Sequence, residues 1–369
     1  MKETRRKRIL LTGGGTGGHL FPAIAAAQQF CREYPGAEVL FVGTKRKMDA
    51  ETLERYGFKG VAINSYGLKG KNMRELVKAL LVLPISCLQA LFILARFRPD
   101  LVLGVGGYVT GPVVAMAKLC RRPTLIHEQN SVPGLANRKL AKLVDRVCVS
   151  LPASASCFPA DKVVFTGNPV RENLVALAAK AREVKEGVTL LVLGGSQGAR
   201  SLNRLIVEAF VGVGSESLAG INLIHQTGTK DLAWVKQAYG DAGRDVWVEP
   251  FFKDMDAVYS QADILVSRAG ATTLAELATL GKPVILVPYP FAADNHQQKN
   301  AEYYVQGGGA LLFKESELTA PQLVEAVISI ATNREQRERM EFNQRRLAPT
   351  DAAGKIVAVC RQLINRDEL

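Results

Sequence analysis

The chain has 369 residues, 47% of them hydrophobic and 22% charged, which is typical of a soluble globular protein and excludes a largely disordered one. Its length suits two ordinary domains. The formal net charge of +12 is uneven, because residues 1–168 hold 25 Lys/Arg against 11 Asp/Glu and the remainder holds 22 against 24, so the first half favours a polyanionic partner, either nucleic acid or an anionic membrane surface, over an ordinary solvated surface.

Cysteine and histidine usage argues against a disulfide framework or a zinc site. The six cysteines form no C-x-x-C pair, and there are only four histidines. Only three apolar residues separate the basic start of the chain from the first glycines, too few for a signal-peptide core. We therefore expect reduced thiols in a cytosolic protein.

Short apolar runs alternate with helical patterns along the whole chain, which predicts strand-helix-strand units and parallel sheets. In the first half the predicted strands span 8–12, 38–43, 60–63, 101–104, 123–127, 146–149 and 163–166. In the second half they lie in "GVTLLVLGG", "INLIHQTG", "VWVEPF", "DILVSRAG", "PVILVPYP" and "GALLF".

Residues 79–95 form an uncharged run that is just short of a membrane-spanning helix. Pro84, Ser86 and Gln89 interrupt it, and it lies between two predicted strands of one sheet. It is predicted to be a crossover helix pair packed on that sheet.

The stretches "RILLTGGGTGGHLFPAIAAAQQF" and "TLLVLGGSQGARSLNRLIVEAF" share one plan: an apolar strand, a glycine-rich turn and an amphipathic helix. Two such openings half a chain apart predict an α/β protein with two Rossmann-like domains facing each other across a cleft. The expected domains are 1–168 and 169–346. A closing helix within 347–369 could pack back on the first domain or stay with the second.

The first glycine turn fits the dinucleotide pattern G-x-G-x-x-G at Gly13, Gly15 and Gly18. NAD is excluded because the second strand runs into the basic stretch 44–47 and not into the acid that would hold the ribose. Basic residues at this position could bind the 2′-phosphate of NADP, so an NADP-dependent oxidoreductase remains an alternative. His19 at the start of the helix is unusual for a dinucleotide loop.

His19 admits a structural reading, as a helix residue packed on the sheet, and a functional one. The positive end of the helix disfavours imidazolium and keeps the ring neutral as a base. Loops after later strands add Tyr108, Glu128 and Asn130, and the carboxyl ends of parallel strands are where ligands bind. This polar set favours the functional reading.

The motifs "GGGTGGH", "GVGGY", "IHEQN", "GNPVR", "GGSQGA" and "SRAGATTLAE…GKPVILVPYP…NHQQKNA" occur in order along nearly the whole chain. Together they closely resemble the bacterial N-acetylglucosaminyltransferases that make lipid II for peptidoglycan. The resemblance implies the GT-B type glycosyltransferase fold. It also implies inverting transfer from UDP-N-acetylglucosamine to the muramic acid 4-hydroxyl of undecaprenyl-pyrophosphoryl-N-acetylmuramyl-pentapeptide (lipid I). The protein is then expected to be a peripheral protein at the cytoplasmic face of the inner membrane.

On the acceptor side, the resemblance implies His19 as the catalytic base, with Glu128 and Asn130 orienting the acceptor or the base, although Glu128 could itself be the base. The acceptor pyrophosphate is expected at the first glycine loop and its neighbour. The acceptor-binding residues are then Gly14, Gly15, His19, Gly106, Gly107 and Tyr108.

On the donor side, the resemblance implies that Glu276 holds the ribose hydroxyls, that Gln297 and Gln298 read the sugar, and that Arg171 lies near the nucleotide. The phosphates are expected at helix N-termini. The full set of donor-binding residues is Thr16, Gly17, Gly18, Asn130, Arg171, Ser196, Gln197, Gly198, Thr272, Thr273, Glu276, Gln297 and Gln298.

No metal and no cofactor is expected. Asp254 and Asp256 form a D-x-D pattern that many nucleotide-sugar enzymes use for a metal, but helix capping together with the helix dipole explains both acids.

The excess of basic residues in the first half of the chain is explained by contact with an anionic bilayer. Lys69, Lys71, Arg74 and Lys78 lie beside an apolar stripe of Met73, Leu76, Val77, Leu80 and Leu81; the alternative is a core helix with a solvated basic edge. Nucleic-acid binding lacks a recognisable module.

Overall fold

The computed structural model describes residues 6–14, 17–65, 73–180, 187–195, 198–213 and 215–365, and for residues 47, 48 and 73–80 it describes the backbone only. The chain folds into two compact units. Unit 1 comprises Met1–Arg171 and Pro349–Leu369, and unit 2 comprises Glu172–Ala348. The chain passes from unit 1 to unit 2 after Arg171 and returns to unit 1 at Pro349.

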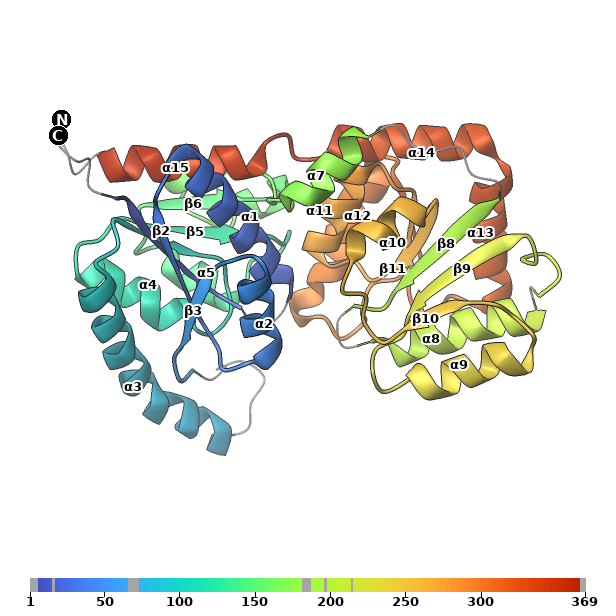
Figure 1. Cartoon of the computed structure of the whole chain (residues 1–369), viewed down its shortest axis with the longest axis horizontal. Helices are drawn as coiled ribbons and strands as arrows, with labels where there is room; N and C mark the ends of the chain where they lie inside the picture. Colours follow the sequence, from blue (N-terminus) through green and yellow to red (C-terminus); the bar gives the residue numbers. More distant parts are fainter. Residues whose placement is uncertain are drawn as a thin grey trace. The chain divides into compact units, whose positions relative to one another are not determined.

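Unit 1 is built on a seven-stranded sheet in the order β3-β2-β1-β4-β5-β6-β7, with every pairing parallel (Figure 1). The strands are β1 (Arg8–Thr12), β2 (Glu38–Gly43), β3 (Lys59–Ala62), β4 (Leu101–Gly104), β5 (Thr124–Glu128), β6 (Arg146–Val149) and β7 (Val163–Phe165). The helices are α1 (Gly17–Glu33), α2 (Lys47–Arg55), α3 (Met73–Phe97), α4 (Thr110–Leu119), α5 (Leu135–Leu140), α6 (Pro152–Ala155) and α15 (Ala352–Asn365), with a 3-10 turn at Ala160–Lys162.

Alternation along the strands gives this sheet two buried faces. Ile9 and Leu11 pack with α1 and α15, whereas Leu10 between them packs with α3 and α4 on the opposite face. A parallel sheet covered on both faces needs near-continuous apolar strands, which is why the strand positions could be predicted. The closing helix α15 contacts α1 in this unit (Figure 1).

The predicted helix pair over 79–95 is wrong, because α3 is one continuous helix from Met73 to Phe97 that contains Pro84. Pro84 lies on the exposed side, so the backbone carbonyl that loses its helical partner there can bond to water. Among the helices of the described residues, none combines the length and hydropathy that crossing a membrane requires.

Unit 2 repeats the plan with a six-stranded parallel sheet in the order β10-β9-β8-β11-β12-β13. Its strands are β8 (Val188–Leu193), β9 (Ile221–Gln226), β10 (Trp247–Glu249), β11 (Ile264–Ser267), β12 (Val284–Leu286) and β13 (Ala310–Leu312). The helices are α7 (Glu172–Ala179), α8 (Arg200–Val207), α9 (Leu232–Asp241), α10 (Met255–Gln261), α11 (Ala271–Leu280), α12 (His296–Gln306), α13 (Ala320–Thr332) and α14 (Arg334–Leu347), with a π turn at Glu208–Val213 and a 3-10 turn at Ala293–Asn295.

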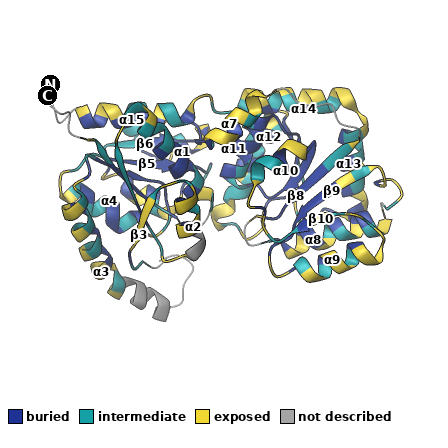
Figure 2. Ribbon diagram, viewed as in Figure 1, coloured by how far each residue is buried: buried dark blue, intermediate teal, exposed yellow. Residues whose placement is uncertain are grey.

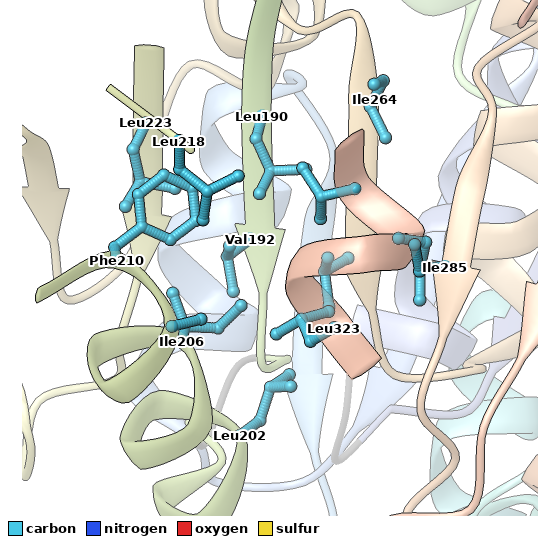
Figure 3. Packing of buried hydrophobic residues seen from close by; sticks show 14 of the residues in the cluster. Leu190, Val192, Leu202, Ile206, Phe210, Leu218, Leu223, Ile264, Ile285 and Leu323 are labelled. Atoms are coloured by element: carbon cyan, nitrogen blue, oxygen red, sulfur yellow. The ribbon is translucent and has the colours of Figure 1, made fainter. Parts of the chain in front are cut away.

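The core of unit 2 lies between one face of this sheet and helices α8, α9 and α13. Figure 3 shows Leu190 and Val192 of β8 facing Leu202 and Ile206 of α8, with Leu323 of α13 beside them. The central strands of both sheets are the most buried layer, whereas the edge strand β3 and the outer helix faces are exposed (Figure 2).

Both sheets reverse their strand order at one point, between β1 and β4 in unit 1 and between β8 and β11 in unit 2. In open α/β sheets, ligands bind outside the carboxyl ends of the strands at such a reversal. The glycine turns after β1 and β8 therefore lie at the expected binding edge of their own unit.

Candidate active site

Two loops of unit 1 meet at the reversal point. Gly106 and Gly107, after β4, have φ values of +100° and +88°, which glycine tolerates far better than other residues. A side chain at Gly107 would lie 2.8 Å from the carbonyl oxygen of Gly14, and one at Gly106 would lie 2.9 Å from the ring of His19. The His19 ring therefore rests on bare backbone.

His19 is joined to β5 through one glutamine. Its Nδ1 lies 3.1 Å from Oε1 of Gln129, and the ring is half-buried. Gln129 is itself buried, and its Nε2 donates to the carbonyl oxygen of Val105 at 2.9 Å and lies 3.1 Å from Nδ1 of His127. Three loops thus converge on one candidate base.

His127 is fully buried beneath this cluster. Its Nε2 lies 3.1 Å from the carbonyl oxygen of Gly167 and 2.9 Å from Oγ of Ser150. Burial lowers the pKa of His127 to about 4, with the Gly167 carbonyl opposing that shift and the nearby His19 adding to it. His127 is therefore neutral near pH 7.

Glu128 is 1% exposed and acts as an acceptor at both carboxylate oxygens. Its Oε1 accepts from the backbone N–H and the side-chain amide of Asn130, while Oε2 accepts from the N–H of Gly134 and the amide of Asn137. Four donors thus surround this carboxylate. The arrangement favours a carboxylate that shapes the loop and holds Asn130 over one that takes a substrate proton.

The other predicted residues of the first glycine turn are only partly described. Gly15 and Thr16 lie outside the described residues. Gly14 has φ +126°, Gly17 begins α1, and Gly18 is exposed.

Two further predicted residues of unit 1 differ in exposure. Tyr108 is 59% exposed, just before α4. Arg171 is buried within the unit, where its guanidinium lies 4.3 Å from the ring centroid of Phe21 and its Nη1 is 3.4 Å from the hydroxyl of Tyr56. These two aromatic contacts could not be predicted from the sequence, because Phe21 and Tyr56 lie far from Arg171 along the chain.

In unit 2 the second glycine turn joins β8 to α8. Ser196 and Gln197 lie outside the described residues. Gly198 has φ +76°, and a side chain there would overlap the carbonyl oxygen of Thr227. The buried Asn203 of α8 donates to the same Thr227 carbonyl at 2.9 Å, which ties this turn to the end of β9.

Glu276 lies on α11, one turn beyond Thr272 and Thr273 at the start of that helix. It is nearly buried, and its Oε2 accepts a 3.0 Å hydrogen bond from the hydroxyl of the buried Tyr259. A carboxylate held in this way has a fixed orientation, as recognition of two adjacent hydroxyls requires.

The two glutamines of α12, Gln297 and Gln298, have different hydrogen-bond partners. Oε1 of Gln297 accepts from the backbone N–H groups of Ala269 and Tyr289, at 3.3 and 2.9 Å, and so joins the loops after β11 and β12. Gln298 is half-buried, with a 3.4 Å contact from its Nε2 to Glu302 of the same helix. Both side chains are half-buried, so both glutamines remain predicted ligand contacts.

The D-x-D acids behave as predicted for a helix start. The carboxylate of Asp254 caps α10 by accepting from the N–H groups of Asp256 and Ala257, and the carboxylate of Asp256 accepts from Asn173. Within the described ranges, no cluster of three or more His, Cys, Asp or Glu side chains could hold a metal ion.

Three residues of this arrangement escaped the sequence analysis. His127 and Gln129 occupy the "IHEQN" motif, and their two-residue spacing on a strand puts them on one face, which was a usable signal. Tyr259 had none, because its role depends on its contact with Glu276 on another helix.

Comparison with known proteins places the chain in a family. Residues 9–149 match the model of the glycosyltransferase family 28 N-terminal domain, and residues 189–356 match that of the C-terminal domain. The enzyme named UDP-N-acetylglucosamine--N-acetylmuramyl-(pentapeptide) pyrophosphoryl-undecaprenol N-acetylglucosamine transferase is 43% identical in Anaeromyxobacter sp. (strain Fw109-5), over 97% of this chain and 94% of that protein. The protein of the same name in Myxococcus xanthus is 41% identical, over 97% and 93%.

Solved structures agree on the fold. The MurG crystal structure from Acinetobacter baumannii matches with a TM-score of 0.74 and 29% identity, over 96% of this chain and 99% of that one. The UDP-GlcNAc 2-epimerase from Neisseria meningitidis, at 16% identity and a TM-score of 0.70 over 96% and 100%, shares the fold alone. The predicted class, two Rossmann-like α/β domains of the GT-B type, is confirmed. Since both family domains match in order along one chain, and relatives this similar span nearly its whole length, the chain belongs to glycosyltransferase family 28.

Proposed function

We propose that this enzyme transfers N-acetylglucosamine from UDP-N-acetylglucosamine to the muramic acid 4-hydroxyl of lipid I, with inversion at the anomeric carbon, and so makes lipid II. One observation carries the proposal: relatives 41–43% identical over almost the whole chain have names that state this donor and this acceptor. The site chemistry described above supports it.

The transfer needs a base for the acceptor hydroxyl. As the hydroxyl oxygen bonds to the anomeric carbon, its proton passes to Nε2 of His19, and the bond from that carbon to the phosphate oxygen breaks to release UDP. His19 suits this role because the ring is half-buried at the binding edge of its sheet and its other nitrogen is already engaged by Gln129. Glu128 is the weaker candidate because four donors occupy its oxygens.

The donor is assigned to unit 2. Glu276, oriented by Tyr259, suits the paired hydroxyls of the ribose, and Gln298 suits those of the sugar. The N-termini of α8 and α11 lie at the reversal point of their sheet, where positive helix ends stabilise the charge that develops on departing UDP. Ser196 and Gln197 remain predicted phosphate contacts.

An NADP-dependent oxidoreductase and a nucleic-acid-binding protein were the alternatives from sequence. Neither is supported, because the matched family domains and the named relatives are glycosyltransferases. The deciding experiment is a transfer assay with UDP-N-acetylglucosamine and a lipid I analogue, with NADPH binding measured in parallel. Formation of the disaccharide product establishes the proposal, and NADPH binding without transfer overturns it.

We also propose that unit 1 rests on the cytoplasmic face of the inner membrane as a peripheral protein. On α3, Leu81, Ile85, Leu88 and Phe92 are all exposed, and their spacing of four, three and four residues puts them on one face of the helix. The +14 charge of residues 1–168 adds attraction to anionic lipid.

The structure does not describe most of the basic and apolar side chains that were first predicted for this surface. Lys69 and Lys71 lie outside the described residues, as do the side chains of Met73, Arg74, Leu76, Val77, Lys78 and Leu80. The exposed face of α3 that starts at Leu81 therefore carries the proposal.

A further inference from the structure

The buried amide beneath the candidate base has an orientation that can be assigned from its neighbours. We propose that Gln129 is a positioning residue that holds His19 in the tautomer with hydrogen on Nδ1, leaving the lone pair of Nε2 free to take the acceptor proton. The inference rests on the proposed transfer reaction and adds a residue that sets the state of its base.

The two ends of the Gln129 amide face different partners. A backbone carbonyl oxygen can only accept, so the amide atom 2.9 Å from the carbonyl oxygen of Val105 must be the nitrogen. The oxygen of the same amide therefore faces Nδ1 of His19, at 3.1 Å.

The tautomer of His127 follows from its own partners. Its Nε2 lies 3.1 Å from the carbonyl oxygen of Gly167, again an atom that can only accept, so Nε2 carries the hydrogen. Since burial keeps this ring neutral, its Nδ1 carries a lone pair. That lone pair accepts the second hydrogen of the Gln129 amide at 3.1 Å. Both amide hydrogens are thus used, and a flipped amide would set its oxygen against two acceptors.

The tautomer of His19 follows in turn. The oxygen of Gln129 can only accept, so Nδ1 of His19 donates, and in the neutral ring Nε2 then has no hydrogen. Among the described residues, Nε2 of His19 has no hydrogen-bond partner. The ring lies on Gly106, where any side chain would displace it.

The chemical consequence is a base in the right form before the substrate arrives. When Nε2 takes the hydroxyl proton, the ring becomes imidazolium and its Nδ1–H remains bonded to Gln129, where the charge strengthens that bond. In the other tautomer Nε2 already bears a hydrogen, so it cannot accept the proton. In serine proteases, a substitution that leaves the catalytic histidine in the wrong tautomer lowers kcat by about 10⁴.

The tautomers can be measured directly by ¹⁵N NMR of protein labelled at its four histidines, at the alkaline plateau of a pH titration. We expect His19 to carry hydrogen on Nδ1 and His127 on Nε2. The other two rings are internal references. His296 has Nδ1 2.8 Å from the carbonyl oxygen of Ala293, and Nε2 of His225 faces the amide oxygen of Asn203. Wild-type His19 with hydrogen on Nε2 would overturn the proposal without any variant.

Gln129→Leu replaces the amide with a slightly shorter apolar side chain, and so removes the acceptor for His19 together with both amide donors. We expect the His19 signal to shift toward the Nε2–H tautomer and kcat to fall about tenfold or more, with the KM for UDP-N-acetylglucosamine changed by less than about threefold. Gln344→Leu is the matched control, because Gln344 is also buried and donates to a backbone carbonyl, that of Gly309, but lies in unit 2. It should alter neither the tautomer nor kcat.

The outcomes separate this inference from the proposed function. An unchanged tautomer in Gln129→Leu, or kcat within threefold of wild type, overturns the role of Gln129 while transfer itself stands. A wild-type enzyme that makes no disaccharide overturns the function, whatever the spectra show. Should Gln129→Leu not fold, the wild-type spectrum still decides.

Discussion

Glu128 and Gln297 show how a single motif residue can hold the loops of a site together. Glu128 accepts four hydrogen bonds from its own loop, and Gln297 joins the backbones of Ala269 and Tyr289. Each polar atom used in this way fixes a loop whose backbone then faces the binding edge. Motif membership alone therefore does not reveal which residues also hold the loops in place, whereas the hydrogen bonds do.

The role of His19 as the base predicts a specific kinetic split. His19→Ala should lower turnover about 10²- to 10⁴-fold, the usual contribution of a general base, because no group replaces Nε2. UDP affinity should stay near normal, because Glu276 and the helix N-termini proposed to hold the nucleotide lie in unit 2. Turnover from single-turnover assays and UDP affinity from calorimetry test both parts. Turnover within about threefold of wild type would make His19 structural and return Glu128 as the base.

The donor carboxylate gives a graded prediction. Glu276→Ala should weaken UDP-N-acetylglucosamine binding by about 1.5–3 kcal/mol, the range for hydrogen bonds to a charged group. Tyr259→Phe keeps the carboxylate and loses only the bond that orients it, so its effect should be smaller, about 0.5–1.5 kcal/mol. Calorimetric titration of both variants against wild type measures the series. Unchanged affinity in Glu276→Ala removes this residue from the donor site.

At the residue scale, the sequence could predict the candidates but not their partners. His19 was found because a histidine at a glycine turn is unusual. Its partner Gln129 lies 110 residues away, and the contact exists only because β4 and β5 follow β1 in the sheet. Arg171 is similar, since its contacts with Phe21 and Tyr56 depend on helices distant in the chain.

At the scale of elements, the strands were predictable because parallel strands buried on both faces must be apolar along their length. The error at α3 arose from reading Pro84 as a break. A proline interrupts one backbone hydrogen bond, and a helix face open to water tolerates that loss. The helix continues through Pro84 because this residue lies on the exposed side of α3, and the sequence alone does not show which side of the helix is exposed.

The start of α10 carries a prediction that separates a helix cap from a metal ligand. Asp254→Ala should reduce the free energy of unfolding by about 1 kcal/mol through loss of the cap, and leave transfer insensitive to EDTA. Asp256→Ala is the control, because its carboxylate accepts from Asn173 and does not cap the helix. Urea denaturation and transfer with and without EDTA measure the two effects. Metal-dependent transfer that either variant abolishes would contradict the capping interpretation.

At the scale of the molecule, two units that share the order of six strands place two binding edges in one chain, each after a glycine turn. The sequence revealed this duplication because the strand-turn-helix plan recurs. It could not fix the path by which α15 returns to unit 1, since its apolar face would suit either sheet. In the structure, α15 packs against α1 of unit 1.

Charge and exposed apolar surface in unit 1 predict reversible binding to anionic membranes. Each Lys or Arg near such a surface contributes about 1 kcal/mol, and the contribution falls as salt screens it. Co-sedimentation with vesicles should therefore rise with anionic lipid and fall with added salt. Changing Lys71, Arg74 and Lys78 to Glu should weaken it.

The apolar part of the same surface is tested by changing Leu81, Leu88 and Phe92 to Ser, which should weaken binding even at low salt because apolar burial is lost. Phe342→Ser is the matched control, since Phe342 is comparably exposed but lies on α14 of unit 2, whose half of the chain has no basic excess. Equal binding of wild type to neutral and anionic vesicles, or binding to neither, would leave α3 as ordinary surface. The enzyme would then need another means of reaching an acceptor that stays in the bilayer.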